Sequence, residues 1–152
     1  MENLNNEGTH IDKLIPKVTG VGGIFFFSED PKELKDWYAK NLGLEINNWG
    51  GATFESRNLH NPKEINGLQW SLFKKGSEYF APSTKEFMIN YRVQNIEGMV
   101  AKLKENGANI LDSITTYEYG KFVHILDTEG NKIELWEPVD EVYDAMLEVR
   151  MK

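Results

Sequence analysis

The chain contains an internal repeat, and this repeat constrains the fold more than any other feature of the sequence. The segment from Gly23 to Asp30 aligns with the segment from Met88 to Asn95 at a shift of 65 residues. The same shift aligns Asn66 to Trp70 with Asn131 to Leu135. Two separate segments that share one shift indicate a duplicated structural unit. We therefore expect two similar modules arranged in tandem.

Each repeat begins with a strand-like segment that leads into a helix with matching start and stop signals. In the first repeat the candidate caps are Asp30 at the start and Gly43 at the end. In the second repeat Asn95 and Gly107 occupy the same places. Asp and Asn are preferred at helix starts, and Gly is preferred just past helix ends. The apolar spacing between the caps predicts helices over residues 31–42 and 96–106.

Further strand-like stretches complete a βαβββ order in each repeat. Strands are expected at 18–28, 44–48, 51–57 and 67–74, and again at 86–93, 109–115, 119–126 and 131–136. Loops are expected at 57–66 and 75–85, and Asp127 to Asn131 has the composition of a tight hairpin turn. The predicted fold class is therefore α+β, in which tandem βαβββ modules form a cupped, barrel-like mixed β-sheet with helices on the outside.

The length of 152 residues suits one structural domain built from both modules. Residues 17–76 would form the first βαβββ module and residues 85–138 the second. Residues 1–16 are polar and aperiodic at their start, which is typical of a flexible N-terminal arm. Residues 139–152 have apolar side chains on one side and are expected to form a short C-terminal helix.

Composition excludes several classes of function. The chain has no cysteine, which excludes disulfides, thiolate metal sites and a cysteine nucleophile. Its formal net charge of −7, with no run of lysine or arginine, argues against nucleic acid or a membrane surface as a partner. No stretch resembles a signal peptide or a bilayer-spanning segment. We expect a soluble cytoplasmic protein.

Strand alternation divides the side chains of the predicted sheet into two faces. One face is almost wholly apolar and is expected to lie against the helices. The other face mixes aromatic side chains with an amide, a hydroxyl, a guanidinium and a carboxylate, which is typical of a small-molecule site. Tyr119 and the loop from Ser77 to Pro82 are placed to overhang this concave face. The candidate ligand-binding residues are Gln69, Ser71, Asn90, Arg92, Trp136 and Tyr119.

Three motifs resemble those of one known group of proteins. The most specific motif runs from Asp127 to Pro138, and the others are Glu29 to Gly43 and Tyr91 to Gly107. They resemble the vicinal oxygen chelate superfamily, which includes glyoxalase I, bleomycin and fosfomycin resistance proteins and extradiol dioxygenases. The resemblance covers residues 18–138. It implies paired βαβββ modules, a small-molecule ligand and a homodimer.

The resemblance also implies where metal ligands would stand. Carried over to this sequence, the positions are Gly23 and Met88 on the first strands and Gln69 and Glu134 on the last strands. Gly23 has no side chain, so it opens space where a ligand histidine would have stood, and the Met88 thioether is a soft ligand unsuited to Zn, Ni, Mn or Fe. A catalytic zinc site normally has three protein ligands. We therefore predict no metal and no cofactor, with a divalent ion at a displaced site as the disfavoured alternative.

Glu134 is the candidate catalytic residue, and the sequence leaves its role open. It is either a structural carboxylate paired with Arg92, an acceptor for a ligand donor, or a general base whose pKa is raised by aromatic surroundings. Arg92 could instead clamp a ligand carboxylate or phosphate. His124 is interpreted as a partly buried histidine with a satisfied hydrogen bond rather than a displaced metal ligand or base.

Three classes of function remain. The preferred one is a glyoxalase- or bleomycin-resistance-like protein that binds a small organic molecule in the concave cavity and has a degenerate metal site. The alternative is a glyoxalase-like lyase or isomerase that acts on a small carbonyl compound, with Glu134 as general base or metal ligand. The third is a structural or regulatory member whose cavity is filled by its own side chains.

Overall fold

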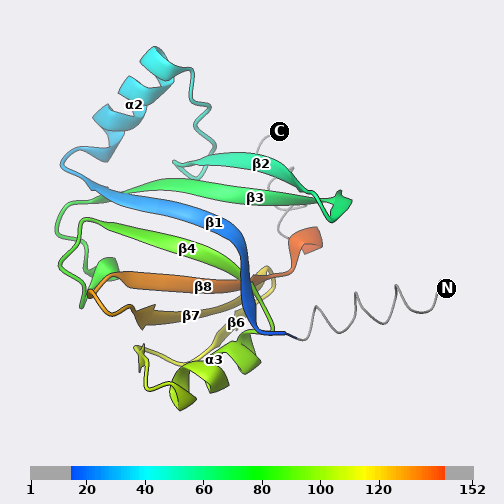
Figure 1. The fold of residues 1–152 in the computed structure, drawn as a ribbon. Helices are drawn as coiled ribbons and strands as arrows, with labels where there is room; N and C mark the ends of the chain where they lie inside the picture. Colours follow the sequence, from blue (N-terminus) through cyan, green and yellow to red (C-terminus); the bar gives the residue numbers. More distant parts are fainter. Residues whose placement is uncertain (1–14, 143–152) are drawn as a thin grey trace.

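The strands of the protein form one mixed sheet in the order β2-β3-β1-β4-β8-β7-β5, with β6 paired to β7 (Figure 1). The structure is a computed structural model, and it describes residues 15–142. The sheet is open, because β2 and β5 lie at its two ends. The predicted N-terminal arm and the predicted C-terminal helix fall almost entirely outside the described residues.

The elements follow the predicted order of strands and helices with a few differences. The first module consists of β1 (Lys17–Ser28), α2 (Pro31–Leu42), β2 (Ala52–Asn58) and β3 (Asn61–Lys74). A short 3₁₀ helix, η1 (Glu78–Phe80), lies in the linker. The second module consists of β4 (Phe87–Gln94), α3 (Ile96–Glu105), β5 (Asn109–Ile110), β6 (Thr115–Tyr117), β7 (Gly120–Leu126) and β8 (Lys132–Pro138).

The duplication is visible in how the strands pair. In each module the first strand lies parallel to the last, so β1 pairs with β3 and β4 pairs with β8. The remaining pairs are antiparallel, including the β1–β4 pair that joins the two modules. The predicted α+β class with tandem modules is therefore confirmed, and the barrel-like sheet is open rather than closed.

The helix boundaries confirm the predicted caps. The Asp30 carboxylate accepts a hydrogen bond from the Glu33 amide at 3.1 Å, and Gly43 ends α2 in a left-handed conformation with φ of 68°. The Asn95 side chain accepts from the Gly98 amide at 3.0 Å at the start of α3. These side chains satisfy amide groups that would otherwise lack partners at a helix start.

Two predictions for the first module are wrong. Residues 44–48 do not form a strand, because the Asn47 side chain accepts hydrogen bonds from the amides of Trp49 and Gly51 and closes a turn there. The segment 57–66 is not a loop, since β3 begins at Asn61 and Arg57 pairs with Ile65. Backbone pairing does not require apolar side chains, so the polar composition of this hairpin concealed it.

The predicted strand 109–115 is divided between β5 and β6. Asp112 lies in the gap between these strands, and its carboxylate accepts a hydrogen bond from the His124 backbone amide on β7 at 2.7 Å. A side chain therefore replaces the backbone partner that a continuous strand would have supplied. The interruption brings an acidic side chain next to β7.

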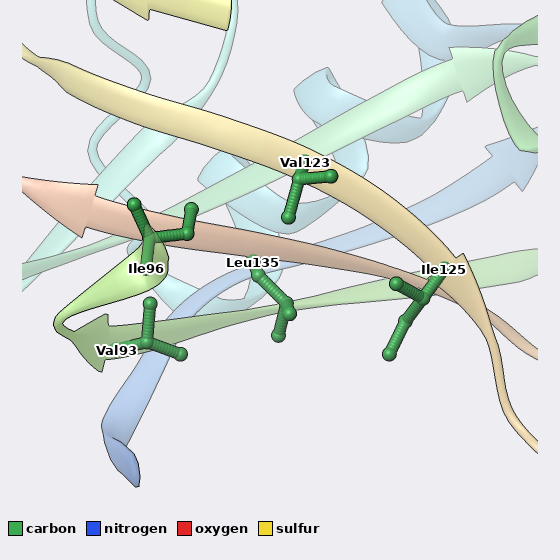
Figure 2. Packing of buried hydrophobic residues seen from close by; sticks show 5 residues of the cluster. All are labelled: Val93, Ile96, Val123, Ile125 and Leu135. Carbon is green, nitrogen blue, oxygen red and sulfur yellow. The ribbon is translucent and has the colours of Figure 1, made fainter. Parts of the chain in front are cut away.

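The apolar core belongs mainly to the second module. Its largest cluster of buried side chains consists of Val93, Ile96, Val123, Ile125 and Leu135 (Figure 2). None of the twelve residues of α2, all of which are described, is buried, although the Tyr38 ring of α2 lies against Trp70 of β3 with ring centroids 5.0 Å apart. Ile24, on the face of β1 predicted to meet a helix, is 40% exposed. Within residues 15–142 no helix is long and apolar enough to cross a bilayer.

Candidate functional site

A row of polar side chains crosses the middle of the sheet on the face opposite α3, which is the face predicted to be concave and is called the concave face below. Consecutive residues of this row are direct partners on neighbouring strands, taken in the order β2, β3, β1, β4, β8 and β7. The six residues are Thr53, Gln69, Gly23, Asn90, Glu134 and His124. The strand register thus brings Gln69, Gly23 and Glu134 into one line, as the repeat implied.

Of the four metal-ligand positions that the resemblance implied, the one assigned to Met88 is occupied by Asn90 in the structure. Asn90 pairs with both Gly23 and Glu134, whereas Met88 pairs with Phe25. In the first module Gly23 pairs with Gln69, 46 residues later, whereas in the second Asn90 pairs with Glu134, 44 residues later. The parallel register of the second module is thus offset by two residues, which the alignment of the repeat could not reveal. Met88 is fully buried and packs against Phe25 and Phe80.

The space beside Gly23 is filled by the chain itself. A Cβ atom added to Gly23 would lie 2.7 Å from Cζ of Phe25, well inside van der Waals contact. The expectation that this glycine opens room for a ligand is therefore wrong, because the aromatic ring of its near neighbour on the same strand occupies that room. Gly23 also interrupts the polar row and divides it into two halves.

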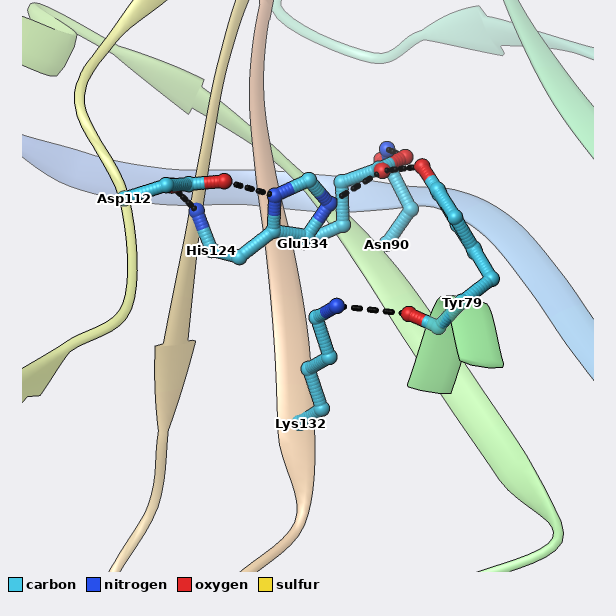
Figure 3. A network of polar contacts seen from close by, with 6 residues as sticks. All are labelled: Tyr79, Asn90, Asp112, His124, Lys132 and Glu134. Atoms are coloured by element: carbon cyan, nitrogen blue, oxygen red, sulfur yellow. Dashed lines mark hydrogen bonds and ion pairs between the residues drawn. The ribbon is translucent and has the colours of Figure 1, made fainter. Parts of the chain in front are cut away.

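Glu134 is the centre of the half that belongs to the second module (Figure 3). Its carboxylate is 4% exposed and accepts hydrogen bonds from three side chains on three different elements. The Asn90 amide donates to Oε1 at 2.7 Å, the Tyr79 hydroxyl to Oε2 at 2.5 Å, and Nε2 of His124 to Oε2 at 2.7 Å. Hydrogen bonds from the protein thus compensate the buried charge, and Arg92 is bonded to Asp140 instead.

His124 lies between two carboxylates. Its Nε2 faces Glu134, and its Nδ1 lies 2.6 Å from Oδ2 of Asp112. Ionised carboxylates only accept hydrogen bonds, so a ring with both nitrogens directed at carboxylates carries both protons. The line from Asp112 through His124 to Glu134 is therefore an anion, a cation and a second anion in sequence.

The pKa values in this cluster move in opposite directions. Burial alone would raise the pKa of Glu134, but the hydrogen bonds from His124, Tyr79 and Asn90 outweigh it and lower that pKa. Burial would likewise lower the pKa of His124, and its bonds to Glu134 and Asp112 reverse the effect and raise it. A carboxyl group with a lowered pKa is a poor general base near neutral pH. The direction is opposite to the raised pKa that a base role for Glu134 would need.

The linker between the modules places Tyr79 over this cluster. Phe80 is buried and stacks on Phe27 with ring centroids 4.5 Å apart, which fixes η1 on the sheet. Tyr79 stacks on Phe73 at 5.2 Å, and its carbonyl oxygen accepts a hydrogen bond from Nζ of Lys132 at 2.5 Å. Tyr79 nevertheless remains 40% exposed. Burial, followed by the charge of Glu134, raises the pKa of its hydroxyl, so it acts as a donor.

The half of the row that belongs to the first module is neutral. Gln69 accepts a hydrogen bond from the Thr53 hydroxyl at 3.1 Å and donates to the Ser71 hydroxyl at 3.1 Å. A Cβ atom at Gly51 would lie 2.5 Å from the Gln69 amide nitrogen, so the side chains pack closely here. Gln69 and Ser71, two of the predicted ligand-binding residues, thus bond to each other.

The remaining predicted residues form a separate group on the same face. Arg92 is 3% exposed, lies over the ring of Trp136 with its guanidinium carbon 4.8 Å from the ring centroid, and bonds to Asp140. The Trp136 indole nitrogen donates to the carbonyl of Tyr119 at 3.1 Å. Arg92 therefore pairs with Asp140. One interpretation of the sequence had paired it with Glu134, and that interpretation is wrong.

The residues at the implied ligand positions do not fit a divalent ion. Gly23 offers no donor, and Phe25 fills its place. Gln69 bonds to Thr53 and Ser71, and both oxygens of Glu134 accept hydrogen bonds from the protein. Within the described residues 15–142, no group of three or more His, Cys, Asp or Glu side chains is arranged to hold a metal.

Sequence reasoning identified Asn90 and Glu134 but did not assemble the whole cluster. Asp112 and Lys132 lie outside the repeat pattern, and Tyr79 belongs to the linker, for which only a position above the face was expected. One signal was available for His124. The turn from Asp127 to Asn131 is centred on Glu129, and His124 and Glu134 each stand five residues from it, so a hairpin pairs them.

The fold and the polar row define a class of protein, in which two βαβββ-type modules share a sheet and carry a site on its concave face. Residues 20–135 match the family described as the Glyoxalase/Bleomycin resistance protein/Dioxygenase superfamily, and the chain belongs to that family. No curated protein matches the sequence.

Solved structures of low sequence identity share this fold. Methylmalonyl-CoA epimerase from Mycobacterium tuberculosis is 17% identical with a TM-score of 0.55, over 84% of this chain and 93% of that chain. A variant of the Streptomyces coelicolor methylmalonyl-CoA epimerase, in complex with 2-nitronate-propionyl-CoA, is 14% identical with a TM-score of 0.59, over 81% and 99%. A superfamily member from Vibrio splendidus 12B01 is 12% identical with a TM-score of 0.53, over 80% and 99%.

Proposed function

We propose that the protein binds a small organic molecule on the concave face, without a metal, through hydrogen bonds to the buried Glu134 carboxylate. The observation that carries this proposal is the set of three donors that surround Glu134, one of which comes from the linker. A ligand O–H or N–H group that replaced the Tyr79 hydroxyl would find an ionised acceptor already oriented by Asn90 and His124. Hydrogen bonds to such charged groups are among the stronger ones.

The linker supports this assignment because a movement of its Tyr79 side chain would give a ligand access to Glu134. Tyr79 is the most exposed of the three donors, at 40%, whereas Asn90 is 2% exposed. Moving Tyr79 would uncover Glu134 while the anchoring ring of Phe80 stayed in its place. The stacked ring of Phe73 would then be available to a flat ligand. The filled-cavity alternative differs in one respect, because it requires Tyr79 to stay in place.

A thermal-shift screen tests the proposal. The protein is first treated with a chelator, and Zn²⁺, Mn²⁺ or Ni²⁺ is then added alone; we expect no stabilisation. Small hydroxy acids, phenols and amides are screened next, and hits are titrated by calorimetry. A Glu134→Gln variant should bind the hits more weakly by about tenfold or more, since a hydrogen bond to a charged group contributes roughly 1.5–3 kcal/mol.

Tyr79→Phe is the matched control for the binding measurement. It removes the hydroxyl that competes for Glu134 and keeps the ring, so hits should bind this variant more tightly than the original chain. Saturable stabilisation by a metal ion, or equal affinity of the hits for Glu134→Gln, would contradict metal-independent binding at Glu134. Failure of every compound to bind either Tyr79→Phe or the original chain would favour the filled cavity.

A second candidate is a lyase or isomerase that acts on a small carbonyl compound, and the lowered pKa of Glu134 ranks it below the first. In that case Glu134 would take a proton from the substrate, and His124 would hold the carboxylate in position. Turnover that disappears in Glu134→Gln while the fold is kept would establish this function. Binding that weakens in the same variant without any measurable turnover of the bound compound would favour the first candidate.

A further inference from the structure

Arg92 is a buried cation on the concave face, and it lies two residues along β4 from Asn90 of the Glu134 cluster. Its side chain is 3% exposed, and its guanidinium lies over Trp136. Asn90 pairs with Glu134 and Arg92 pairs with Trp136, so the two polar centres are two residues apart on the same strands. At about 3.3 Å per residue this is a separation of roughly 7 Å along the sheet. A buried charge of this kind is costly unless an anion compensates it.

The compensating carboxylate comes from outside the sheet. Asp140 follows the end of β8, and its side chain is 20% exposed. Its Oδ1 accepts a hydrogen bond from Nη1 of Arg92 at 3.0 Å, and Nη2 bonds the same oxygen. The ion pair therefore joins a buried residue of the sheet to a more exposed residue that lies beyond the end of β8.

Arg92 is held rigidly by its surroundings. A Cβ atom at Gly22 would lie 3.0 Å from Cγ of Arg92 and 2.9 Å from Cε3 of Trp136. The arginine stem and the indole therefore rest against β1, where glycine leaves room for them. The position of the guanidinium is set before any anion arrives, which lowers the entropic cost of binding one.

We propose that Arg92 is the carboxylate-binding site of the concave face and that Asp140 is an internal occupant which a ligand carboxylate displaces. This inference rests on the proposed function, and it specifies the ligand as a small organic acid that also carries an O–H or N–H group. The carboxylate binds Arg92, and the hydroxyl or amino group reaches Glu134 roughly 7 Å away along the strands. Asp140 limits the apparent affinity, because the site is open only when the aspartate has left it.

The test uses Asp140→Asn with lactate as the probe, followed by thermal shift and calorimetry. Sodium chloride at equal ionic strength and lactamide, which lacks the carboxylate, are the controls. The variant should melt below the original chain, because it leaves a buried guanidinium without an anion. Lactate should restore its melting temperature in a saturable way and bind it about tenfold more tightly than the original chain, as expected when an internal competitor is removed. Asp112→Asn, which removes a carboxylate elsewhere on this face, should show no such rescue.

A second measurement covers the case in which Asp140→Asn does not fold. In the original chain, the side-chain nitrogen resonance of Arg92 should shift on titration with lactate, and an Arg92→Lys variant assigns that resonance. If lactate stabilises Asp140→Asn no more than chloride or lactamide, or leaves the Arg92 resonance unmoved, the proposal is overturned and the pair is an ion pair of the fold only.

Acetate separates this inference from the proposed function on which it rests. Acetate has a carboxylate but no further donor. If acetate and lactate rescue Asp140→Asn equally, and Glu134→Gln does not change their affinities, the Arg92 site holds and hydrogen bonding to Glu134 fails. If lactate binds more tightly than acetate and loses that advantage in Glu134→Gln, both hold together.

Discussion

The two modules have the same strand pairing but differ on both faces of the sheet. In the second module α3 covers a cluster of buried apolar side chains, and the concave face holds a charged network around Glu134. In the first module α2 buries none of its described residues, and the concave face holds the neutral Thr53, Gln69 and Ser71. A duplicated backbone therefore does not require duplicated chemistry.

The location of the charged network follows from the packing of the two modules. A buried carboxylate needs several donors in fixed positions, and fixed positions need a well-packed support. The second module supplies that support on the other face of the same strands. In the first module the Tyr38 ring of α2 lies against Trp70 of β3, but Trp37 and Leu42 of the same helix are exposed, and the polar row contains no ionised group. Packing on one face thus goes together with charge on the other.

The largest expected contrast between the modules concerns their helix-facing sides. Leu135→Ala, in the core beneath α3, should lower the free energy of unfolding by about 2–5 kcal/mol, because it leaves a cavity among buried side chains. Leu42→Ala on α2, where the side chain is 64% exposed, should change it by less than about 0.5 kcal/mol. Chemical denaturation of both variants measures the contrast, and equal losses would show that α2 is packed in solution.

The next contrast compares the two halves of the polar row. Glu134→Gln should destabilise the protein by about 2–3 kcal/mol, since it removes the charge that His124, Tyr79 and Asn90 surround. Gln69→Ala, at the corresponding place in the first module, should cost only about 1 kcal/mol, because it removes neutral hydrogen bonds. Urea titrations of both variants give the comparison. A cost for Gln69→Ala as large as that for Glu134→Gln would remove the distinction between the halves.

The glycines of β1, which lie where the modules meet, allow a sharper test. Gly22→Ala should destabilise by about 1–3 kcal/mol, because its Cβ atom would lie 2.4 Å from Oδ1 of Asn90. Gly20→Ala is the matched control, since its Cβ atom would have no contact closer than 3.8 Å, to Cδ of Arg92. The control should be neutral or slightly stabilising. Thermal melts of the two variants measure the difference. Equal melting temperatures for Gly22→Ala and Gly20→Ala would mean that the Asn90 side chain is not held against β1.

The smallest expected effect is the dependence of stability on pH, and it belongs to the second module alone. The pKa of His124 is raised from its ordinary value of 6.5, so its contribution is present below pH 6.5 and is lost as the pH rises through the folded-state value. The pKa of Glu134 is lowered from 4.5, so its contribution is present above pH 4.5 and is lost as the pH falls. The network is therefore most stabilising between these limits.

Denaturation at a series of pH values measures this profile, and His124→Gln is the variant that tests its origin. The variant should lose the decline on the alkaline side, because it has no proton to release there. A profile that keeps its alkaline decline in His124→Gln would assign the titration to another group.

The sequence predicted the repeated parts of the fold well and the unique parts poorly. Helix caps are local signals, so α2 was predicted at its observed bounds, and α3 to within a residue. The hairpin between β2 and β3 was missed because its pairing depends on backbone groups. Asn90 was assigned to the right face, but its place beside Glu134 depends on a β4–β8 register that differs by two residues from that of β1–β3, and such a shift leaves the side-chain alternation unchanged. Tyr79 and Asp112 reach the site from irregular segments, which have no periodicity to extend.

The burial of Phe80 has a consequence for how this chain can be divided. Its ring lies against Phe27 of β1 and Phe73 of β3, so the connection between the halves is itself part of the interior. If the chain were cut before residue 77, the first fragment would lack Phe80 and its Phe27 and Phe73 rings would be uncovered. The second fragment would carry Phe80 without these partners. Complementation between separately expressed halves should therefore depend on which fragment carries residues 77–82.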